Sequence, residues 1–273
     1  MIQFSLLGSG SSGNALLVVG TSGKILIDNG LSFRQLERRT QHLGLSLDDL
    51  AAVFVTHEHG DHVNGIGVLA RKRDVPIYMT QATCEHLPKK IGAVPRIEIF
   101  ESGETITVEE FTLTSFSVSH DAADPVSFTV NCNGCRLGLA TDLGRASHLV
   151  RQRLKGCHAL ILESNYCPEM LRTSSYPIAI RQRIGSAQGH LSNHEMNSLL
   201  SGLLHDELQM VIAVHVSQEN NSEEKARTLA SQVLRNHSAT LVIAQQDEPT
   251  PLFTVQPHGA AQTAPPQLRA QAG

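Results

Sequence analysis

Residues 56–62 read Thr56-His57-Glu58-His59-Gly60-Asp61-His62 and directly follow the apolar run Ala52-Val53-Phe54-Val55. Three imidazoles and a carboxylate within six residues form a cluster that surface loops rarely contain by chance. Imidazole combined with carboxylate suits Zn²⁺, and Mn²⁺ or Fe where water fills more positions. The run before the loop predicts a strand and residues 63–73 predict a helix, so both ends of the loop are held. The cluster therefore predicts a metal site at a strand end.

The spacing of these side chains is compatible with more than one ion. On an extended backbone, His57, His59 and Asp61 project to one side while His62 points elsewhere, so a turning loop can offer ligands to two neighbouring ions. The alternative is a polar surface loop with a fortuitous run of histidines. HExxH, the pattern of helix-borne protease zinc sites, does not occur in the sequence.

Composition limits the class of protein. The 273 residues carry 22 basic and 26 acidic side chains, and 41% are hydrophobic, which gives room for a real core and excludes disorder over the whole length. Tryptophan is absent and aromatic residues total 4%, which argues against binding of single-stranded nucleic acid through many stacked aromatic side chains. The sequence has no basic leader before an apolar segment and no apolar run near the roughly 18 residues of a membrane span. It predicts a soluble, cytoplasmic protein without a membrane partner.

Short β-rich runs alternate with helical patterns, which predicts mixed sheet flanked by helices, an α/β layered domain. The expected strands are 4–7, 15–19, 24–28, 52–56, 76–79, a meander within 97–140, 159–162, 210–214 and 239–244. The expected helices are 33–43 after an N-cap at Ser32, 63–73, 193–204 and 223–234. Prolines accumulate from Pro249, so we expect a last edge strand at 252–255 and one domain over 1–255, followed by a disordered tail over 256–273.

Two short motifs have competing interpretations. Cys132-Asn133-Gly134-Cys135 spells CxxC, but Asn-Gly between two β-rich runs is typical of a two-residue hairpin turn, and an odd total of five cysteines argues against a disulfide framework. The run at 8–13 matches GxGxxG, but a β-rich segment follows it where a dinucleotide fingerprint must open a helix. That turn either faces its amides to a substrate phosphate or is a plain hairpin turn. Asp28 either supports the metal loops or is a plain turn aspartate.

His57-x-His59-x-Asp61-His62 after an apolar strand resembles the signature of the metallo-β-lactamase superfamily, and the resemblance covers about residues 1–250. It implies a four-layer αββα sandwich with mixed sheets, helices on the outer faces and metals at one edge. Three later residues each follow a predicted strand, and the resemblance adds them to the ligands: His120, Asp142 and His215. It places His57, His59 and His120 on a first ion. It places Asp61, His62 and His215 on a second ion, with Asp142 bridging both.

The second half of the chain narrows the branch. Residues 160–166, 189–193 and 215–221, together with the opening 7–14, are similar to the YycJ/WalJ (VicX) group, which is related to the tRNase Z and PhnP phosphodiesterases. Members of that group are described as DNA exonucleases. The resemblance implies a 5′-to-3′ exonuclease with DNA as its substrate and two divalent metal ions, Zn²⁺ in first place and Mn²⁺ as the alternative.

Phosphodiester hydrolysis needs a nucleophile, neutralised phosphoryl oxygens and a proton for the leaving alkoxide. Two metals supply the first two by acidifying a shared water and clamping the phosphate. His190 is the candidate general acid, with Glu163 orienting it and favouring its protonated form. The expected catalytic residues are Asp61, His190 and Glu163.

Two other function classes stay open at this point. One is a small-molecule hydrolase on the same scaffold, acting on a cyclic phosphodiester, a thioester or a lactam, and the other is a non-enzymatic metal-binding regulator. A net charge of −4 weighs weakly against an extended DNA grip, whereas basic clusters such as Arg172, Arg181 and Arg183 favour a nuclease if several line one groove to the metals. The sequence leaves the oligomeric state open.

Overall fold

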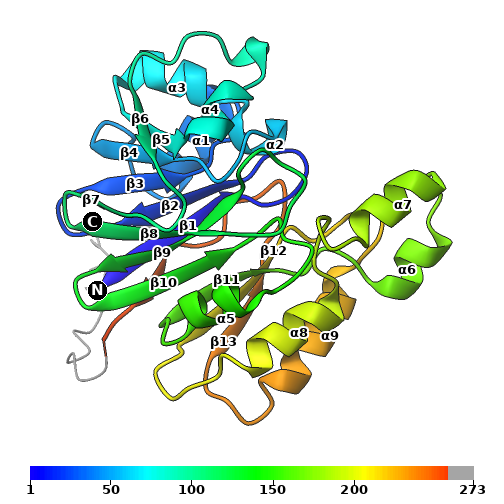
Figure 1. Cartoon of the computed structure of the whole chain (residues 1–273). Coiled ribbons are helices and arrows are strands. Elements are labelled where there is room, and N and C mark those ends of the chain that lie inside the picture. Colours follow the sequence, from blue (N-terminus) through cyan, green and yellow to red (C-terminus); the bar gives the residue numbers. More distant parts are fainter. Residues whose placement is uncertain (258–273) are drawn as a thin grey trace, which may run out of the picture.

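The computed structural model describes residues 1–257, and within this range the strands form two seven-stranded sheets (Figure 1). In spatial order, the first sheet contains β14 (Phe253–Val255), β1 (Ile2–Gly8), β2 (Ala15–Val19), β3 (Lys24–Ile27), β4 (Leu50–Phe54), β5 (Ile77–Thr80) and β6 (Ile97–Phe100). The second contains β13 (Thr240–Ile243), β12 (Met210–Val214), β11 (Ala159–Glu163), β10 (Cys135–Ala140), β9 (Val126–Cys132), β8 (Phe111–Ser117) and β7 (Thr105–Val108). Each sheet is antiparallel on one side and parallel on the other, so both are mixed.

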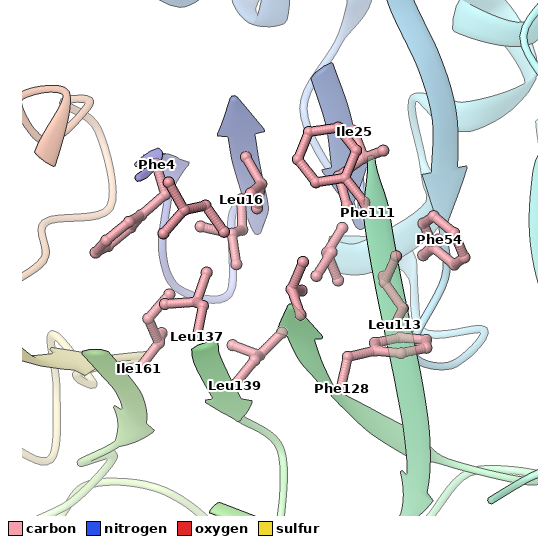
Figure 2. Packing of buried hydrophobic residues seen from close by; sticks show 14 of the residues in the cluster. Phe4, Leu16, Ile25, Phe54, Phe111, Leu113, Phe128, Leu137, Leu139 and Ile161 are labelled. Atoms are coloured by element: carbon pink, nitrogen blue, oxygen red, sulfur yellow. The ribbon is translucent and has the colours of Figure 1, made fainter. Parts of the chain in front are cut away.

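An apolar core fills the space between the two sheets. Figure 2 shows side chains from both sheets pointing into it, among them Phe4 and Phe54 from the first sheet and Phe128 and Ile161 from the second. The rings of Phe54 and Phe128 meet edge to face, with centroids 5.8 Å apart. On β11 the neighbouring Leu160 belongs to a different buried cluster, because successive side chains of a strand point to opposite faces. Strands buried on both faces therefore need a second layer outside each sheet.

Helices supply these outer layers. On the first sheet, apolar side chains of α1 (Phe33–His42) and α3 (Ile66–Arg73) pack against the face opposite the shared core. On the second sheet the same role falls to α5 (His148–Leu154), α8 (Asn193–Ser201) and α9 (Glu223–Val233). The order helix, sheet, sheet, helix confirms the predicted αββα sandwich. The short helices α6 (Pro168–Thr173) and α7 (Ile178–Ile184) project away from these layers (Figure 1).

The predicted helix over 63–73 is wrong in its start and its continuity. A short helix, α2 (Gly60–Val63), already begins inside the histidine loop, and α3 begins only at Ile66. The break lies at Gly65, where a Cβ atom would lie 1.9 Å from the carbonyl oxygen of Leu31, so the chain can pass there only without a side chain. The structure also contains helices that the sequence patterns did not predict: α5, α6, α7 and the short α4 (Gln81–Glu85).

The hairpin interpretation of the CxxC motif is confirmed. Cys132 and Cys135 are opposite each other in the antiparallel register of β9 and β10. Asn133 and Gly134 between them both have positive φ, 50° and 76°, as a type I′ turn requires. The five cysteines are free thiols. The glycine-rich turn 8–13 joins β1 to the antiparallel β2, which excludes a dinucleotide fingerprint there.

The predicted tail begins at Gln256, whose amide donates to Gln209 Oε1 at 3.2 Å. Residues 258–273 of that tail lie outside the described residues. Within residues 1–257, none of the helices combines the length and the apolar character that crossing a membrane demands.

Glu110, in the turn between β7 and β8, links the two sheets. Its carboxylate accepts hydrogen bonds from the Ser22 amide (2.7 Å) and the Thr21 hydroxyl (2.7 Å) in the β2–β3 turn, and from Asn133 Nδ2 (2.6 Å) in the β9–β10 turn. Although partial burial raises the pKa of Glu110, these hydrogen bonds lower it to about 2. The ionised carboxylate thus fastens one turn of the first sheet to two turns of the second.

We expect Glu110→Gln to lower the melting temperature at pH 7 by about 2–4 °C, which corresponds to about 1 kcal/mol after allowance for solvent screening. The pKa of Glu110 is depressed in the folded state from 4.5 to about 2, so its stabilisation is present above pH 4.5 and disappears as the pH falls towards 2. Thermal unfolding followed by circular dichroism should therefore show a difference that shrinks at acidic pH. The matched control is Glu109→Gln at the exposed neighbouring carboxylate. Equal melting temperatures at pH 7 would contradict this role.

Candidate metal centre

The predicted ligands gather where strands of both sheets end. The 56–62 loop follows β4 of the first sheet, while His120, Asp142 and His215 follow β8, β10 and β12 of the second. His120 Nε2 lies 3.2 Å from His59 Nδ1, and Asp142 Oδ2 lies 3.2 Å from His62 Nε2. These side chains surround a cavity of about 200 Å³, whose lining residues are Ser11, His59, Asp61, His120, Asp142, Arg183, His190 and His215.

Three imidazole nitrogens form the first group. His59 Nδ1 lies 3.1 Å from His57 Nε2 and 3.2 Å from His120 Nε2. Nitrogens around one tetrahedral Zn²⁺ lie roughly 3.3 Å apart, because each sits about 2.0–2.1 Å from the ion. The remaining nitrogens of His57 and His120 are used elsewhere: His57 Nδ1 lies 2.9 Å from the Thr56 hydroxyl, and His120 Nδ1 donates to the Gly189 carbonyl at 3.0 Å. The three nitrogens that face one another are therefore the ones available to an ion.

The second group contains Asp61, His62 and His215. Asp61 Oδ2 lies 3.5 Å from His62 Nε2 and 3.9 Å from His215 Nε2. Asp142 lies between the two groups, since its Oδ2 is 3.2 Å from His62 Nε2 and its Oδ1 is 3.9 Å from His120 Nε2. Asp142 Oδ1 also lies 3.1 Å from His215 Nδ1, so this carboxylate is near members of both groups, as a bridging ligand would be.

The loop at residues 56–62, called the metal loop below, is not extended throughout, so the alternation of side chains expected for an extended backbone does not hold. His59 precedes α2, and Asp61 and His62 lie within this helix. Asp61 and His62 lie in this helical turn near His215, whereas His59 lies next to His120. His57 is near both sets, because a single ion could be held by His57, His59 and His120 or by His57, His62 and Asp142.

Strained backbone recurs at the strand ends. Asp28, Asp142 and His215 have φ values of 60°, 53° and 54°, in the left-handed region that residues other than glycine seldom occupy. Each follows directly on, or one residue after, a strand that leads to the site. Such strain persists only where the surrounding structure enforces it, and it clusters at functional sites.

Asp28 holds the metal loop. Its two oxygens accept hydrogen bonds from the Thr56 amide, the Thr56 hydroxyl and His62 Nδ1, each at 2.8 Å. Because His62 donates from Nδ1 to this carboxylate, its Nε2 is left to face Asp61 and Asp142. Gly30 completes the support, since a Cβ atom there would lie 1.8 Å from the carbonyl oxygen of Asp61. Of the two interpretations of Asp28, the structure favours support of the metal loop.

Glu163, at the end of β11, is fully buried and binds two imidazoles. Its Oε1 accepts from His190 Nδ1 at 2.8 Å and from His215 Nδ1 at 3.1 Å, while Oε2 accepts from the amides of Leu143 and Leu191. Although burial raises the pKa of Glu163, these partners, His190 first, lower it to about 2. The carboxylate is therefore an acceptor only, so both imidazoles donate from Nδ1.

The electrostatics of the cluster fit divalent cations. Burial lowers the pKa of His57 well below its ordinary value and also lowers that of His120, which keeps both imidazoles neutral, as ligation requires. Burial also opposes the charge on His62 and His215, yet Asp142 and neighbouring carboxylates raise both pKa values well above the ordinary range. The carboxylates thus attract positive charge to a buried site, and cations held by these same groups would supply it.

Comparison with known proteins identifies the family of this chain. A family model described as a beta-lactamase superfamily domain matches residues 24–216. The chain belongs to the metallo-β-lactamase superfamily. Within it, the exodeoxyribonuclease YycJ of Bacillus anthracis is 39% identical over 85% of this chain and 89% of that protein. The exodeoxyribonuclease WalJ of Streptococcus pneumoniae D39 is 34% identical over 85% and 88%. The crystal structure of YhfI from Bacillus subtilis shares the fold, with a TM-score of 0.70 and 18% identity over 91% of this chain and 98% of that one.

In this member of the metallo-β-lactamase superfamily, Asn14 and Arg183 lie at the site but were not among the predicted ligands or catalytic residues. Of the basic cluster Arg172, Arg181 and Arg183, only Arg183 lines the cavity. Asn14 Nδ2 lies 3.2 Å from Asp61 Oδ2, and Arg183 lines the cavity beside Asp121. Asn14 and Arg183 stand far from the histidine loop in sequence, and no spacing rule connects them to it. Six other histidines do not line this cavity: His42, His86, His148, His158, His205 and His237. His258 lies outside the described residues.

We expect the purified protein to bind two equivalents of Zn²⁺ and His59→Ala to retain no more than about one. His59 Nδ1 is the nitrogen common to both short contacts of the first group, so its loss leaves two ligands there. Mass-spectrometric metal analysis after gel filtration provides the measurement, with His86→Ala at an exposed site outside the cavity as control. Unchanged metal content in His59→Ala would remove this residue from the site.

Asp28→Asn should weaken the second metal about 10- to 100-fold, because the amide no longer holds His62 with a charged acceptor. Competition with a chromophoric chelator measures the two affinities separately. Asp206→Asn, at an exposed loop carboxylate, is the control. An affinity equal to that of the wild type would show that Asp28 does not position the ligand.

Proposed function

We propose that this protein is a metal-dependent DNA exonuclease, acting in the 5′-to-3′ direction in the cytoplasm. The observation that carries the proposal is the placement of His190, held by buried Glu163, in the same cavity as the metal-ligand cluster. A proton donor beside a metal pair is the combination that phosphodiester hydrolysis requires. The substrate class is supported by two relatives named exodeoxyribonucleases, which this chain matches over almost their whole length. Five free cysteines are consistent with a reducing compartment.

We propose seven ligands for two divalent ions: His57, His59 and His120 for the first, Asp61, His62 and His215 for the second, and Asp142 between them. An imidazole-rich donor set favours Zn²⁺, with Mn²⁺ as the alternative. When bound, such a pair supplies neutralisation of the phosphoryl oxygens and an activated water.

Residues of the chain itself supply the proton that the leaving alkoxide needs. His190 donates from Nδ1 to Glu163, so Nε2 is the atom that can release a proton to the leaving alkoxide. Its side chain is only 15% exposed, which limits exchange with bulk water. Glu163, ionised and completely buried, accepts from His190 Nδ1 and would stabilise positive charge on this ring during proton transfer. Asp61 serves in the same cavity as a ligand and completes the expected catalytic set.

The size of the cavity favours a polymer end over a free small molecule. Pockets for small ligands usually enclose about 300–1,000 Å³, whereas this one encloses about 200 Å³. A phosphate and part of a nucleotide fit inside while the rest of the strand lies on the surface. A thioesterase or lactamase does not need the His190–Glu163 proton donor. A regulator that only binds metal would need neither this His190–Glu163 hydrogen bond nor a cavity for substrate.

Four substrates offered side by side test the proposal: 5′-phosphorylated duplex DNA, a tRNA precursor, bis(p-nitrophenyl) phosphate and a β-lactam, each with Zn²⁺ or Mn²⁺. We expect release of mononucleotides from the DNA. His190→Ala should lower kcat about 10²- to 10⁴-fold and leave metal content unchanged, because the residue transfers a proton and holds no ion. His86→Ala is the control.

Activity confined to the lactam would overturn the phosphodiesterase assignment. Loss of metal from His190→Ala would instead show that His190 is a metal ligand. This outcome is a real test, because His190 Nδ1 lies only 3.7 Å from Asp142 Oδ1.

A further inference from the structure

Arg183 combines a metal-site location with an exposed position on a projecting helix. It lies near the end of α7, which projects from the layers together with α6 (Figure 1) and buries none of its residues. Its side chain is 50% exposed. Among the described residues that line the metal cavity, it is the only arginine or lysine. The predicted metal ligands do not need a positively charged side chain beside them. The position of Arg183 at the mouth of the site therefore requires a different explanation.

The end of α7 that carries Arg183 is anchored beside the metal ligands. In the loop after the helix, the Ala187 carbonyl accepts a hydrogen bond from the Ser119 hydroxyl at 2.6 Å, and the Gly189 carbonyl accepts one from His120 Nδ1 at 3.0 Å. Gly189 permits this close packing, since a Cβ atom there would lie 2.2 Å from the Arg183 carbonyl oxygen. The projecting helix therefore holds its C-terminal residues at a fixed place relative to the cluster.

Asp121 orients the guanidinium and leaves its outer edge free. The carboxylate accepts from Arg183 Nε at 2.5 Å, and its other oxygen lies 3.5 Å from His120 Nε2. Within the part of the chain that the structure describes, neither terminal nitrogen of Arg183 has a hydrogen-bond partner. Two parallel N–H groups on one edge of a guanidinium match two oxygens of a phosphate.

We propose that Arg183, positioned by Asp121, binds a phosphate group of the substrate strand next to the metal centre. The proposal rests on the proposed function and names a contact for the same site. The phosphate is either the scissile diester or the terminal monoester, and both present the oxygen pair that the guanidinium recognises. Arg183 thus touches substrate, and Asp121 is a positioning residue.

A surface ion pair without a ligand role is the competing explanation, and such pairs contribute little to stability. Arg181 distinguishes the two, because it lies on the same helix and carries the same charge. Its Nη1 donates to the Arg172 carbonyl, and it does not line the cavity. Arg181→Ala therefore removes equal charge from α7 without removing the proposed contact.

Binding is measured by fluorescence anisotropy on the metal-loaded protein. The probe is a short single strand whose linkages at the 5′ end are phosphorothioates, which resist hydrolysis, prepared with a 5′-phosphate or a 5′-hydroxyl. Inorganic phosphate, titrated by calorimetry, provides a second probe that does not depend on nuclease activity. We expect Arg183→Ala to raise the dissociation constants about 10- to 100-fold, as expected for loss of a bidentate charged contact, and Arg181→Ala to change them less than about threefold.

A loss confined to the 5′-phosphorylated strand assigns Arg183 to the terminal phosphate, and an equal loss for both strands assigns it to the scissile diester. Arg183→Gln keeps the length of the side chain without its charge and should show the same loss with an unchanged melting temperature. Wild-type affinity of Arg183→Ala for strand and phosphate, or an equal loss in Arg181→Ala, would overturn the proposal. A protein that binds phosphate through Arg183 yet hydrolyses no DNA would reject only the proposed function.

Discussion

The buried carboxylate of Asp142 is the group on which the site depends. It enters from the second sheet and lies 3.2 Å from His62 of the first sheet's metal loop and 3.1 Å from His215 of its own sheet. Although burial raises the pKa of Asp142, these two imidazoles hold it well below its usual range. An ionised carboxylate in a buried position costs several kcal/mol of desolvation unless positive charge lies beside it. His215 and His62, which both belong to the second group, provide that charge.

The αββα sandwich makes this concentration of charge possible. Apolar side chains from both sheets fill the space between them (Figure 2), and the predicted ligands lie where strands of both sheets end. Ligands on separate sheets are thus held against each other by the packing of the core, with Glu110 fastening turns of the two sheets to each other. The rigid core fixes the separation of groups that belong to distant parts of the sequence.

The sequence was most informative where the determining interactions are local. The hairpin at Asn133, the cap at Ser32 and the histidine loop were each recognisable from a few adjacent residues. His120, Asp142 and His215 became persuasive only as a set that follows successive strands, with the family resemblance to connect them. The break at Gly65 and the position of Arg183 could not be predicted, because each depends on a segment far away in sequence, Leu31 in one case and Asp121 in the other. Short helices such as α7 carry too few residues to show a clear period.

Glu163 Oε1 accepts from both His190 and His215. In the proposed function these are the proton donor and a ligand of the second ion, so one oxygen atom would serve both. Because the two imidazoles share one acceptor, a stronger hydrogen bond from one weakens the hydrogen bond from the other. Any substitution of Glu163 therefore changes the hydrogen bonds of both imidazoles at once.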